Sequence, residues 1–226
     1  MKKEMIHRFE RKFMVEGVPA WEVRGWVQRH WAIFCRQYDA RWINNVYLDT
    51  PELSHYRENI EGIGERLKVR LRWYGEPGRV QKAALELKSK TGFVIHKETR
   101  PLESVPPVGD ASWYGPAFAR WLHSQPEVWQ PALDGVQPVL VNRYRREYFI
   151  SADGQFRLTL DTDLHYFPVS GQPSAGKTTA YSQRGTIVEL KYALDQDDAA
   201  QHITSCFPFR LTRSSKYVMG VNRLFA

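Results

Sequence analysis

Short runs in which charged and apolar residues alternate constrain the fold of this chain more than any other feature of the sequence. In ERLKVRLRWY, residues 65–74, one face carries Arg66, Lys68, Arg70 and Arg72, and the other carries Leu67, Val69, Leu71 and Trp73. A period of two residues is the signature of a β-strand. About eight such runs recur, at residues 6–15, 43–50, 65–74, 81–89, 92–99, 139–149, 155–162 and 184–192. The sequence therefore predicts a mainly β (α+β) fold.

Helix signals are few in comparison. Residues 19–32, residues 112–123 and the segment from Asp195 onward combine apolar spacing or terminal signals that favour helices. Two stretches rich in Pro, Gly and Ser, at residues 101–116 and 167–185, are predicted to be connections. The helices are therefore expected to flank a sheet rather than to form a layer of their own.

The charged faces of the predicted strands are crowded with basic residues. A single amphipathic strand needs no more explanation than an apolar side in the core and a charged side in water. Here the pattern recurs in most strands, and like charges on one strand face repel each other. Some of the cations are answered by acidic residues on the same faces, namely Glu10, Glu86, Asp161 and Glu189. The remaining excess of cations leaves room for a polyanionic ligand.

A closed barrel reconciles apolar faces with charged ones, because the charged faces can line its lumen. About eight strands enclose enough space for one small ligand. We therefore predict a closed eight-stranded antiparallel β-barrel tunnel with a polar, basic lumen, flanked by a few helices. The 226 residues suffice for one domain or two small ones, and we predict a single tunnel domain over residues 1–226.

Composition narrows the class of protein further. The net charge of +7 points to an anionic partner. The two cysteines, Cys35 and Cys206, have no metal-type spacing, which favours a reducing compartment. No apolar run approaches the roughly 18 residues of a transmembrane helix, and the first residues lack the apolar region of a signal peptide. We expect a cytoplasmic protein with no transmembrane segment of its own.

One stretch matches the P-loop pattern of nucleotide-binding proteins. GQPSAGKT, residues 171–178, fits G-x-x-x-x-G-K-[ST], which requires a strand before it and a helix that begins at the lysine. The residues after Lys177 are polar and lead into a predicted strand, and Pro173 lies inside the pattern. We interpret the match as accidental and predict that residues 167–185 join the last two strands.

A basic lumen with a few carboxylates is suited to phosphate chemistry. Arginine and lysine make charge-assisted hydrogen bonds to phosphate oxygens. Carboxylates hold Mg²⁺ or Mn²⁺, which bridge to phosphates. Phosphoryl transfer depends mainly on positioning and on charge neutralisation. The pattern therefore favours binding, cleavage or extension of a linear phosphate chain.

An ordered set of short motifs runs through nearly the whole chain. The motifs, over residues 8–221, are RFERKF, VYLDT, RLKVRLRWYG, LELKSKTG, YRREYF, FRLTLDTDL, VELKY and SSKYVMG. In this order they resemble the VTC (vacuolar transporter chaperone) domain, the polyphosphate polymerase domain of the triphosphate tunnel metalloenzymes. The resemblance implies a tunnel of eight antiparallel strands. It also implies transfer of the γ-phosphate of ATP to a growing polyphosphate chain with Mn²⁺ or Mg²⁺.

The resemblance also implies roles for individual residues. The catalytic, phosphate-binding residues would be Lys12, Arg70, Arg72, Lys88, Arg146, Arg157 and Lys216. Further substrate-binding residues along the tunnel would be Arg66, Lys68, Lys97 and Lys191. Glu189 would be the main metal ligand, with Glu10 as a helper. Of three neighbouring arginines at 143, 145 and 146, we choose Arg146 because it shares a strand face with Tyr144.

Alternatives to these roles stay open at the level of residues. Glu189 could pair with an arginine of the lumen instead of a metal. Lys12 and Lys216 could be ordinary surface lysines. Tyr47 and Asp49, in the VYLDT motif, are expected to be structural rather than catalytic.

Alternatives also stay open at the level of function. A triphosphatase would use the same cations and carboxylates, and a non-catalytic module would bind triphosphate or polyphosphate without turnover. A nucleic-acid partner is not expected, because a duplex could not enter the barrel and inward-facing aromatic residues for base stacking are scarce. The eukaryotic complexes of the family carry a transmembrane part, which leaves a membrane partner protein open.

Overall fold

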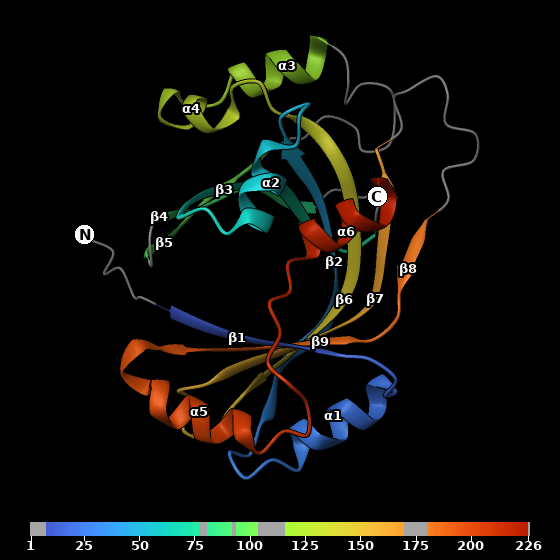
Figure 1. Cartoon of the computed structure of the whole chain (residues 1–226), viewed down its shortest axis with the longest axis vertical. Coiled ribbons are helices and arrows are strands. Elements are labelled where there is room, and N and C mark those ends of the chain that lie inside the picture. The colour runs from blue at the N-terminus through green and yellow to red at the C-terminus, as the bar shows by residue number, and fades with distance from the viewer. Residues whose placement is uncertain (1–7, 77–80, 92–93, 104–115, 170–179, 226) are drawn as a thin grey trace. The chain divides into compact units, whose positions relative to one another are not determined.

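The computed structural model describes residues 8–76, 81–91, 94–103, 116–169 and 180–225. Its strands are β1 (Arg8–Val15), β2 (Cys35–Asp49), β3 (Glu65–Tyr74), β4 (Gln81–Thr91), β5 (Val94–Pro101), β6 (Gln137–Ile150), β7 (Arg157–Pro168), β8 (Tyr181–Gln183) and β9 (Thr186–Ala193). Its helices are α1 (Ala20–Gln28), α2 (Ser54–Glu61), α3 (Pro116–His123), η2 (Glu127–Trp129), α4 (Gln130–Leu133), η3 (Leu194–Gln196), α5 (Asp197–Ser205) and α6 (Lys216–Phe225) (Figure 1). The prediction of a mainly β fold with a few helices is confirmed.

The strands follow the order β1-β9-β7-β6-β2-β3-β4-β5, and β8 pairs with β7 beside this path. The pairs β1–β9, β9–β7, β2–β3, β3–β4 and β4–β5 are antiparallel. Each of the eight runs predicted from the sequence corresponds to one strand of the path, whereas the short β8 was not predicted. In the part of the chain that the structure describes, the path is open, with β1 and β5 at its ends. Closure into a barrel therefore stays a prediction.

The chain divides into two compact units. Unit 1 comprises Met1–Arg41, Tyr144–Leu164 and Gln183–Ser214, and unit 2 comprises Trp42–Arg143, His165–Ser182 and Ser215–Ala226. The boundaries between the units fall within β2, β6 and β7. Neither unit is a continuous stretch of sequence, and the single domain expected from the sequence stays a prediction.

In unit 1, α1 and α5 cover the apolar face of the strands (Figure 1). Val23 and Val27 from α1 and Ile203 from α5 belong to one buried cluster with Val188 and Leu190 of β9. Because side chains alternate along a strand, burial of this face leaves the charged residues of β1 and β9 on the opposite one.

Arg11 is the charged residue on the helix-covered face of β1. Its guanidinium donates to the Tyr192 hydroxyl at 2.9 Å, to the Thr204 hydroxyl at 3.1 Å and to the Asp197 carboxylate at 3.1 Å. Thr204 and Asp197 belong to α5, so Arg11 fastens this helix to the sheet.

In unit 2, α3, η2 and α4 cover the apolar face of the strands. Phe118 of α3 and Trp129 of η2 belong to one buried cluster with Leu71 and Trp73 of β3 and Leu85 of β4. The alternation in 65–74 thus has the predicted outcome, in which leucine, valine and tryptophan are buried and the basic residues occupy the other face.

Asp49, at the end of β2, fixes two helices of unit 2. Its buried carboxylate accepts hydrogen bonds from the backbone N–H groups of His55 at 2.9 Å and Tyr56 at 3.0 Å, in the first turn of α2. The Tyr217 hydroxyl of α6 also donates to it. The N-cap residue of α2 makes no side-chain cap, so the Asp49 carboxylate, six and seven residues earlier, satisfies the N–H groups of His55 and Tyr56. Asp49 therefore has the structural role that we expected.

Several predicted boundaries need correction. Helix α1 ends at Gln28 rather than near 32, and α2, α4 and α6 were not predicted. The connection predicted at 167–185 is partly strand, because β7 runs to Pro168 and β8 begins at Tyr181. GQPSAGKT, at 171–178, lies outside the described residues, as do residues 112–115 of the second predicted helix.

Candidate functional site

A row of three lysines crosses β3, β4 and β5 in unit 2. Lys68 lies opposite Lys88, and Lys88 lies opposite Lys97 on the next strand. Like charges directly opposite each other destabilise a sheet, because they are held a few ångströms apart. A bound polyanion would offset this repulsion.

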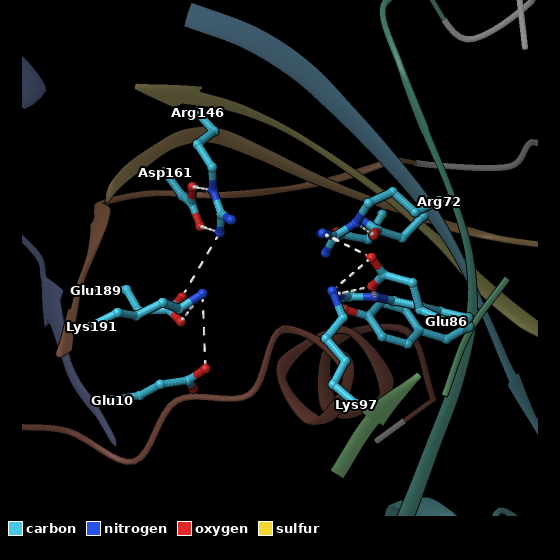
Figure 2. A network of polar contacts seen from close by, with 12 residues as sticks. Glu10, Arg72, Glu86, Lys97, Arg146, Asp161, Glu189 and Lys191 are labelled. Carbon is cyan, nitrogen blue, oxygen red and sulfur yellow. Dashed lines mark hydrogen bonds and ion pairs between the residues drawn. The ribbon is translucent and has the colours of Figure 1, made fainter. Parts of the chain in front are cut away.

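The neighbouring row of unit 2 is centred on a buried carboxylate. Glu86 accepts hydrogen bonds from the Arg70 guanidinium at 2.6 and 2.8 Å and from the Lys97 ammonium at 2.9 Å (Figure 2). Arg72 lies 3.4 Å from the same carboxylate and donates to the Asn45 side chain at 3.0 Å. Burial by itself would raise the pKa of the Glu86 carboxyl. The three cations lower it by more, so that the net pKa is about 2, below the ordinary 4.5. Glu86 is therefore ionised at neutral pH and holds the guanidinium groups in fixed positions.

We call this group the β3–β5 cluster; it comprises Arg66, Lys68, Arg70, Arg72, Glu86, Lys88 and Lys97. Lys68 also donates to the Ser215 hydroxyl at 2.9 Å. Ser215 directly precedes Lys216, the first residue of α6. The chain therefore returns to the cluster at the position of another predicted phosphate-binding lysine.

A second charged group lies on β1, β9 and β7 in unit 1, on the face opposite the helices. Glu10 lies opposite Lys191 and Lys191 opposite Arg157, while in the next row Lys12 lies opposite Glu189. The Lys12 ammonium lies 3.0 Å from Glu10. The Lys191 ammonium lies 3.0 Å from Glu189 and 3.8 Å from Glu10 (Figure 2). Each of these two rows therefore sets a cation opposite a carboxylate between β1 and β9, and Arg157 adds a second cation on β7.

Arg146 of β6 completes this group, which we call the β1–β9 cluster; its members are Glu10, Lys12, Arg146, Arg157, Asp161, Glu189 and Lys191. The Arg146 guanidinium makes two hydrogen bonds to the buried Asp161 carboxylate, at 2.6 and 2.7 Å, and lies 3.8 Å from Glu189 (Figure 2). This two-point contact fixes the plane of the guanidinium.

Neighbouring carboxylates keep Lys12 and Arg146, two cations of the β1–β9 cluster, in their charged form. Burial lowers the pKa of Lys12, but Glu189 and Glu10 raise it more, so the net direction is upward. Burial also opposes ionisation of Arg146, and Asp161 more than offsets it, which leaves the pKa of Arg146 well above its ordinary value. Both can therefore donate to an anion at neutral pH.

The three neighbouring arginines on β6 have different surroundings. Arg143 stacks on Trp42, with its guanidinium carbon 4.0 Å from the ring centroid, and contacts Glu76 at 3.3 Å. Arg145 is exposed. Of these three arginines, Arg146 is the member of the β1–β9 cluster, and its role in phosphate binding stays a prediction.

Sequence reasoning missed the polar residues that position the cations. It did not single out Asn45 or Ser215, and it expected Tyr47, whose hydroxyl accepts a hydrogen bond from Arg70 at 3.5 Å, to be structural. Asn45 and Tyr47 share a strand face two residues apart, and this period could have linked them to the charged face.

The carboxylates of the β1–β9 cluster supply too few oxygen ligands for a metal ion by themselves, and phosphate oxygens of a bound substrate would supply the others. Within residues 8–76, 81–91, 94–103, 116–169 and 180–225, no group of three or more His, Cys, Asp and Glu is placed to hold a metal ion. Glu10 and Glu189 both contact Lys191, so two carboxylates are brought together. Mg²⁺ is usually held by one or two carboxylates plus substrate phosphates. The donor set therefore fits an ion that phosphate oxygens help to bind.

Comparison with known proteins adds a family and a fold. The family model of the VTC domain matches residues 7–111 and 120–225. Among solved structures, the PH1819 protein from Pyrococcus horikoshii OT3 has a TM-score of 0.54 at 12% identity, over 96% of this chain and 99% of that chain. A proposed adenylyl cyclase from Hippeastrum, HpAC1, with a dominant triphosphatase activity, has a TM-score of 0.56 at 16% identity, over 96% of each chain.

Two negative findings complete the comparison. A search of curated proteins gave no match. Among the helices of the described residues, none has the length and apolar character that a membrane span requires.

Proposed function

Because the chain belongs to the VTC domain family, we propose that it is a metal-dependent polyphosphate polymerase, which transfers the γ-phosphate of ATP to a growing polyphosphate chain. The observation that carries this proposal is the row Lys68, Lys88 and Lys97. Like charges at facing positions of a sheet repel each other, and a linear phosphate chain supplies several negative charges to such a face. The proposed location is the cytoplasm, and a membrane partner protein stays a prediction.

In the proposed reaction the basic residues bind and orient the phosphates. In the β3–β5 cluster, Arg70 and Arg72 are held by Glu86 and would donate to phosphate oxygens from fixed positions. In the β1–β9 cluster, Arg146 is held in the same way by Asp161. Donors that are oriented before the reaction stabilise charge on the transferring group without reorganisation. Lys12, Lys88, Arg157 and Lys216 would add neutralising charge, with Arg66, Lys68, Lys97 and Lys191 along the bound chain.

Glu189 is the residue that we propose as the main metal ligand, with Glu10 as a helper. Both are partly or fully buried and both contact Lys191, so their carboxylates would hold a divalent ion in place of that contact. Mn²⁺ or Mg²⁺ would neutralise charge on phosphate oxygens.

A triphosphatase is the second candidate function. The observation that favours it is the fold shared with HpAC1, which is described by its dominant triphosphatase activity. The two functions use the same cations and carboxylates and differ in whether water or a phosphate chain attacks. A binding module without turnover is the third.

Product analysis separates these functions. The purified protein is incubated with ATP labelled at the γ-phosphate and with Mn²⁺, and the products are resolved on a gel. We expect a ladder of phosphate chains, and Glu189→Gln should abolish it while labelled ATP still binds. Free phosphate alone would identify a triphosphatase, and retention of label without products would leave a binding module.

Variants of the β3–β5 cluster test the site itself. Arg70→Ala combined with Arg72→Ala should abolish triphosphate binding, because both fixed guanidinium donors are lost. The matched control is Arg100→Ala, which removes an exposed cation of β5 outside the cluster. Undiminished binding by the double variant would refute the assignment of this cluster to phosphate.

A further inference from the structure

Two tyrosines and an arginine form an aromatic cluster on unit 1 that the proposed reaction does not use. The rings of Tyr38 on β2 and Tyr148 on β6 meet edge to face, with centroids 5.8 Å apart and planes at 83°. The guanidinium carbon of Arg41 lies 5.4 Å from the Tyr38 centroid and 5.7 Å from that of Tyr148. Tyr38 is nevertheless 50% exposed. The half-exposed Tyr38 ring, with a cation beside it, is therefore accessible to a ligand.

The position of Tyr148 on β6 connects this cluster with Arg146. Glu147 hydrogen-bonds to Arg24 of α1, and Phe149 belongs to the buried cluster under the helices. Tyr148 lies between them in sequence and therefore points to the other face of the strand, which also carries Arg146. Two residues along a strand span about 7 Å. A ligand whose phosphate contacts Arg146 can therefore reach Tyr148 with a group about 7 Å from that phosphate.

The chemistry of the cluster matches a nucleobase. Bases stack on tyrosine rings and on the planes of arginine guanidinium groups, and every base offers such a face. A phosphate chain has no flat apolar surface and gains nothing from the rings. The cluster therefore distinguishes a nucleoside triphosphate from inorganic triphosphate.

We propose that Tyr38, Arg41 and Tyr148 form a stacking site for the base of a nucleoside triphosphate whose phosphates contact Arg146. This inference rests on the proposed function, because it assigns the base-binding part of the same site. It makes ATP bind by its base as well as by its phosphates. After the γ-phosphate is transferred, the nucleoside diphosphate leaves with its base and frees the cluster for the next nucleotide, whereas the phosphate chain stays on the cations.

The test compares two ligands with the full-length protein. Binding of the non-hydrolysable β,γ-imido analogue of ATP and of inorganic triphosphate is measured by calorimetric titration. Tyr38→Ala should weaken binding of the ATP analogue about tenfold, since loss of one base-stacking contact costs about 1–3 kcal/mol. Binding of triphosphate should change less than about twofold, because Tyr38 does not contact phosphate in the proposed mode.

Two further variants control for effects on folding. Tyr38→Phe keeps the ring and should restore most of the affinity for the ATP analogue. Trp21→Ala removes another aromatic side chain of unit 1, which is 69% exposed and lies on α1, and should leave both ligands unaffected. Arg41→Ala should weaken the ATP analogue selectively, as Tyr38→Ala does.

The outcomes separate this inference from the proposed function. Selective loss of the ATP analogue in Tyr38→Ala supports the stacking site. Equal affinity of Tyr38→Ala and wild type for the analogue, or a parallel loss of both ligands, would overturn it. If wild type binds triphosphate but Tyr38 has no influence, the phosphate site stands and only the stacking site falls. If wild type binds neither ligand, both proposals fail.

Discussion

At the scale of residues, Glu86 makes the stability of the protein depend on pH. Burial opposes its ionisation, but Arg70, Arg72 and Lys97 lower its pKa from the ordinary 4.5 to about 2. A carboxylate with a depressed pKa stabilises the folded state above the unfolded pKa, and this contribution is lost as pH falls toward the folded pKa. We therefore expect Glu86 to contribute about 3 kcal/mol to the free energy of unfolding at neutral pH and progressively less between pH 4.5 and pH 2.

Urea unfolding of wild type and Glu86→Gln, at neutral pH and at several values in this window, measures the contribution. The difference in free energy of unfolding between the two proteins should shrink as pH falls, because only wild type carries the titrating group. Glu98→Gln, at an exposed position of β5, is the matched control and should follow wild type throughout. A difference that stays constant with pH would contradict the assignment.

The sequence predicted on which face of its strand each charged residue lies, but it did not predict which residue forms an ion pair with which. The period of two placed Arg70, Glu86 and Arg146 on charged faces from the sequence alone. Which cation meets which carboxylate depends on strand register: Arg70 lies opposite Glu86 because β3 and β4 pair at that offset. The contact of Arg146 with Asp161 likewise joins two strands, and no local signal fixes it.

Two glycines lie within helices, and we expect substitution by alanine to have opposite effects on stability at the two positions. A Cβ on Gly220 of α6 would lie 2.6 Å from the Tyr166 ring and 2.9 Å from a Leu140 methyl. A Cβ on Gly25 of α1 would meet only the mobile end of Arg29, at 3.0 Å. Gly220→Ala should therefore destabilise the protein by about 1–3 kcal/mol through overpacking. Gly25→Ala should stabilise it by up to about 1 kcal/mol, since alanine favours a helix.

Chemical denaturation of both variants beside wild type provides the measurement. Each variant serves as the control for the other, because the substitution is identical and only the surroundings differ. Stabilisation by Gly220→Ala would show that α6 does not pack against Tyr166 and Leu140 as the structure has it.

The helices that the sequence did not predict differ in what could have revealed them. In α6, apolar residues recur at helical spacing, at Tyr217, Val221 and Leu224. The sequence from the SSKYVMG motif onward therefore contained a helix signal. In α2, His55 is the buried residue and the segment SHYRENIE is otherwise polar. Its N-terminus depends on Asp49, which precedes the helix by several residues. Only the fold itself brings that carboxylate to the helix.

At the scale of the whole molecule, the sequence predicted the class of fold better than its topology. The eight strands of the path and the VTC domain resemblance are confirmed. The strand order is not local, since β1 pairs with β9 from the other end of the chain. Pairing over such separations is decided by the packing of whole faces, and short-range patterns carry no information about it.

The two units have separate apolar clusters but share three strands, and this sharing bears on how cooperatively the protein unfolds. The boundaries within β2, β6 and β7 mean that neither unit can unfold without breaking strands that continue into the other. We therefore expect one calorimetric transition, with equal calorimetric and van't Hoff enthalpies. Asp161→Ala, which removes both hydrogen bonds from the carboxylate to the buried Arg146 of unit 1, should cost about 3–5 kcal/mol and lower Tm of that whole transition by roughly 10 °C. Asp163→Asn, at an exposed position of β7, is the control and should leave Tm nearly unchanged. If Asp161→Ala instead splits the transition, so that only one part moves, the units fold independently and the single-domain prediction is wrong.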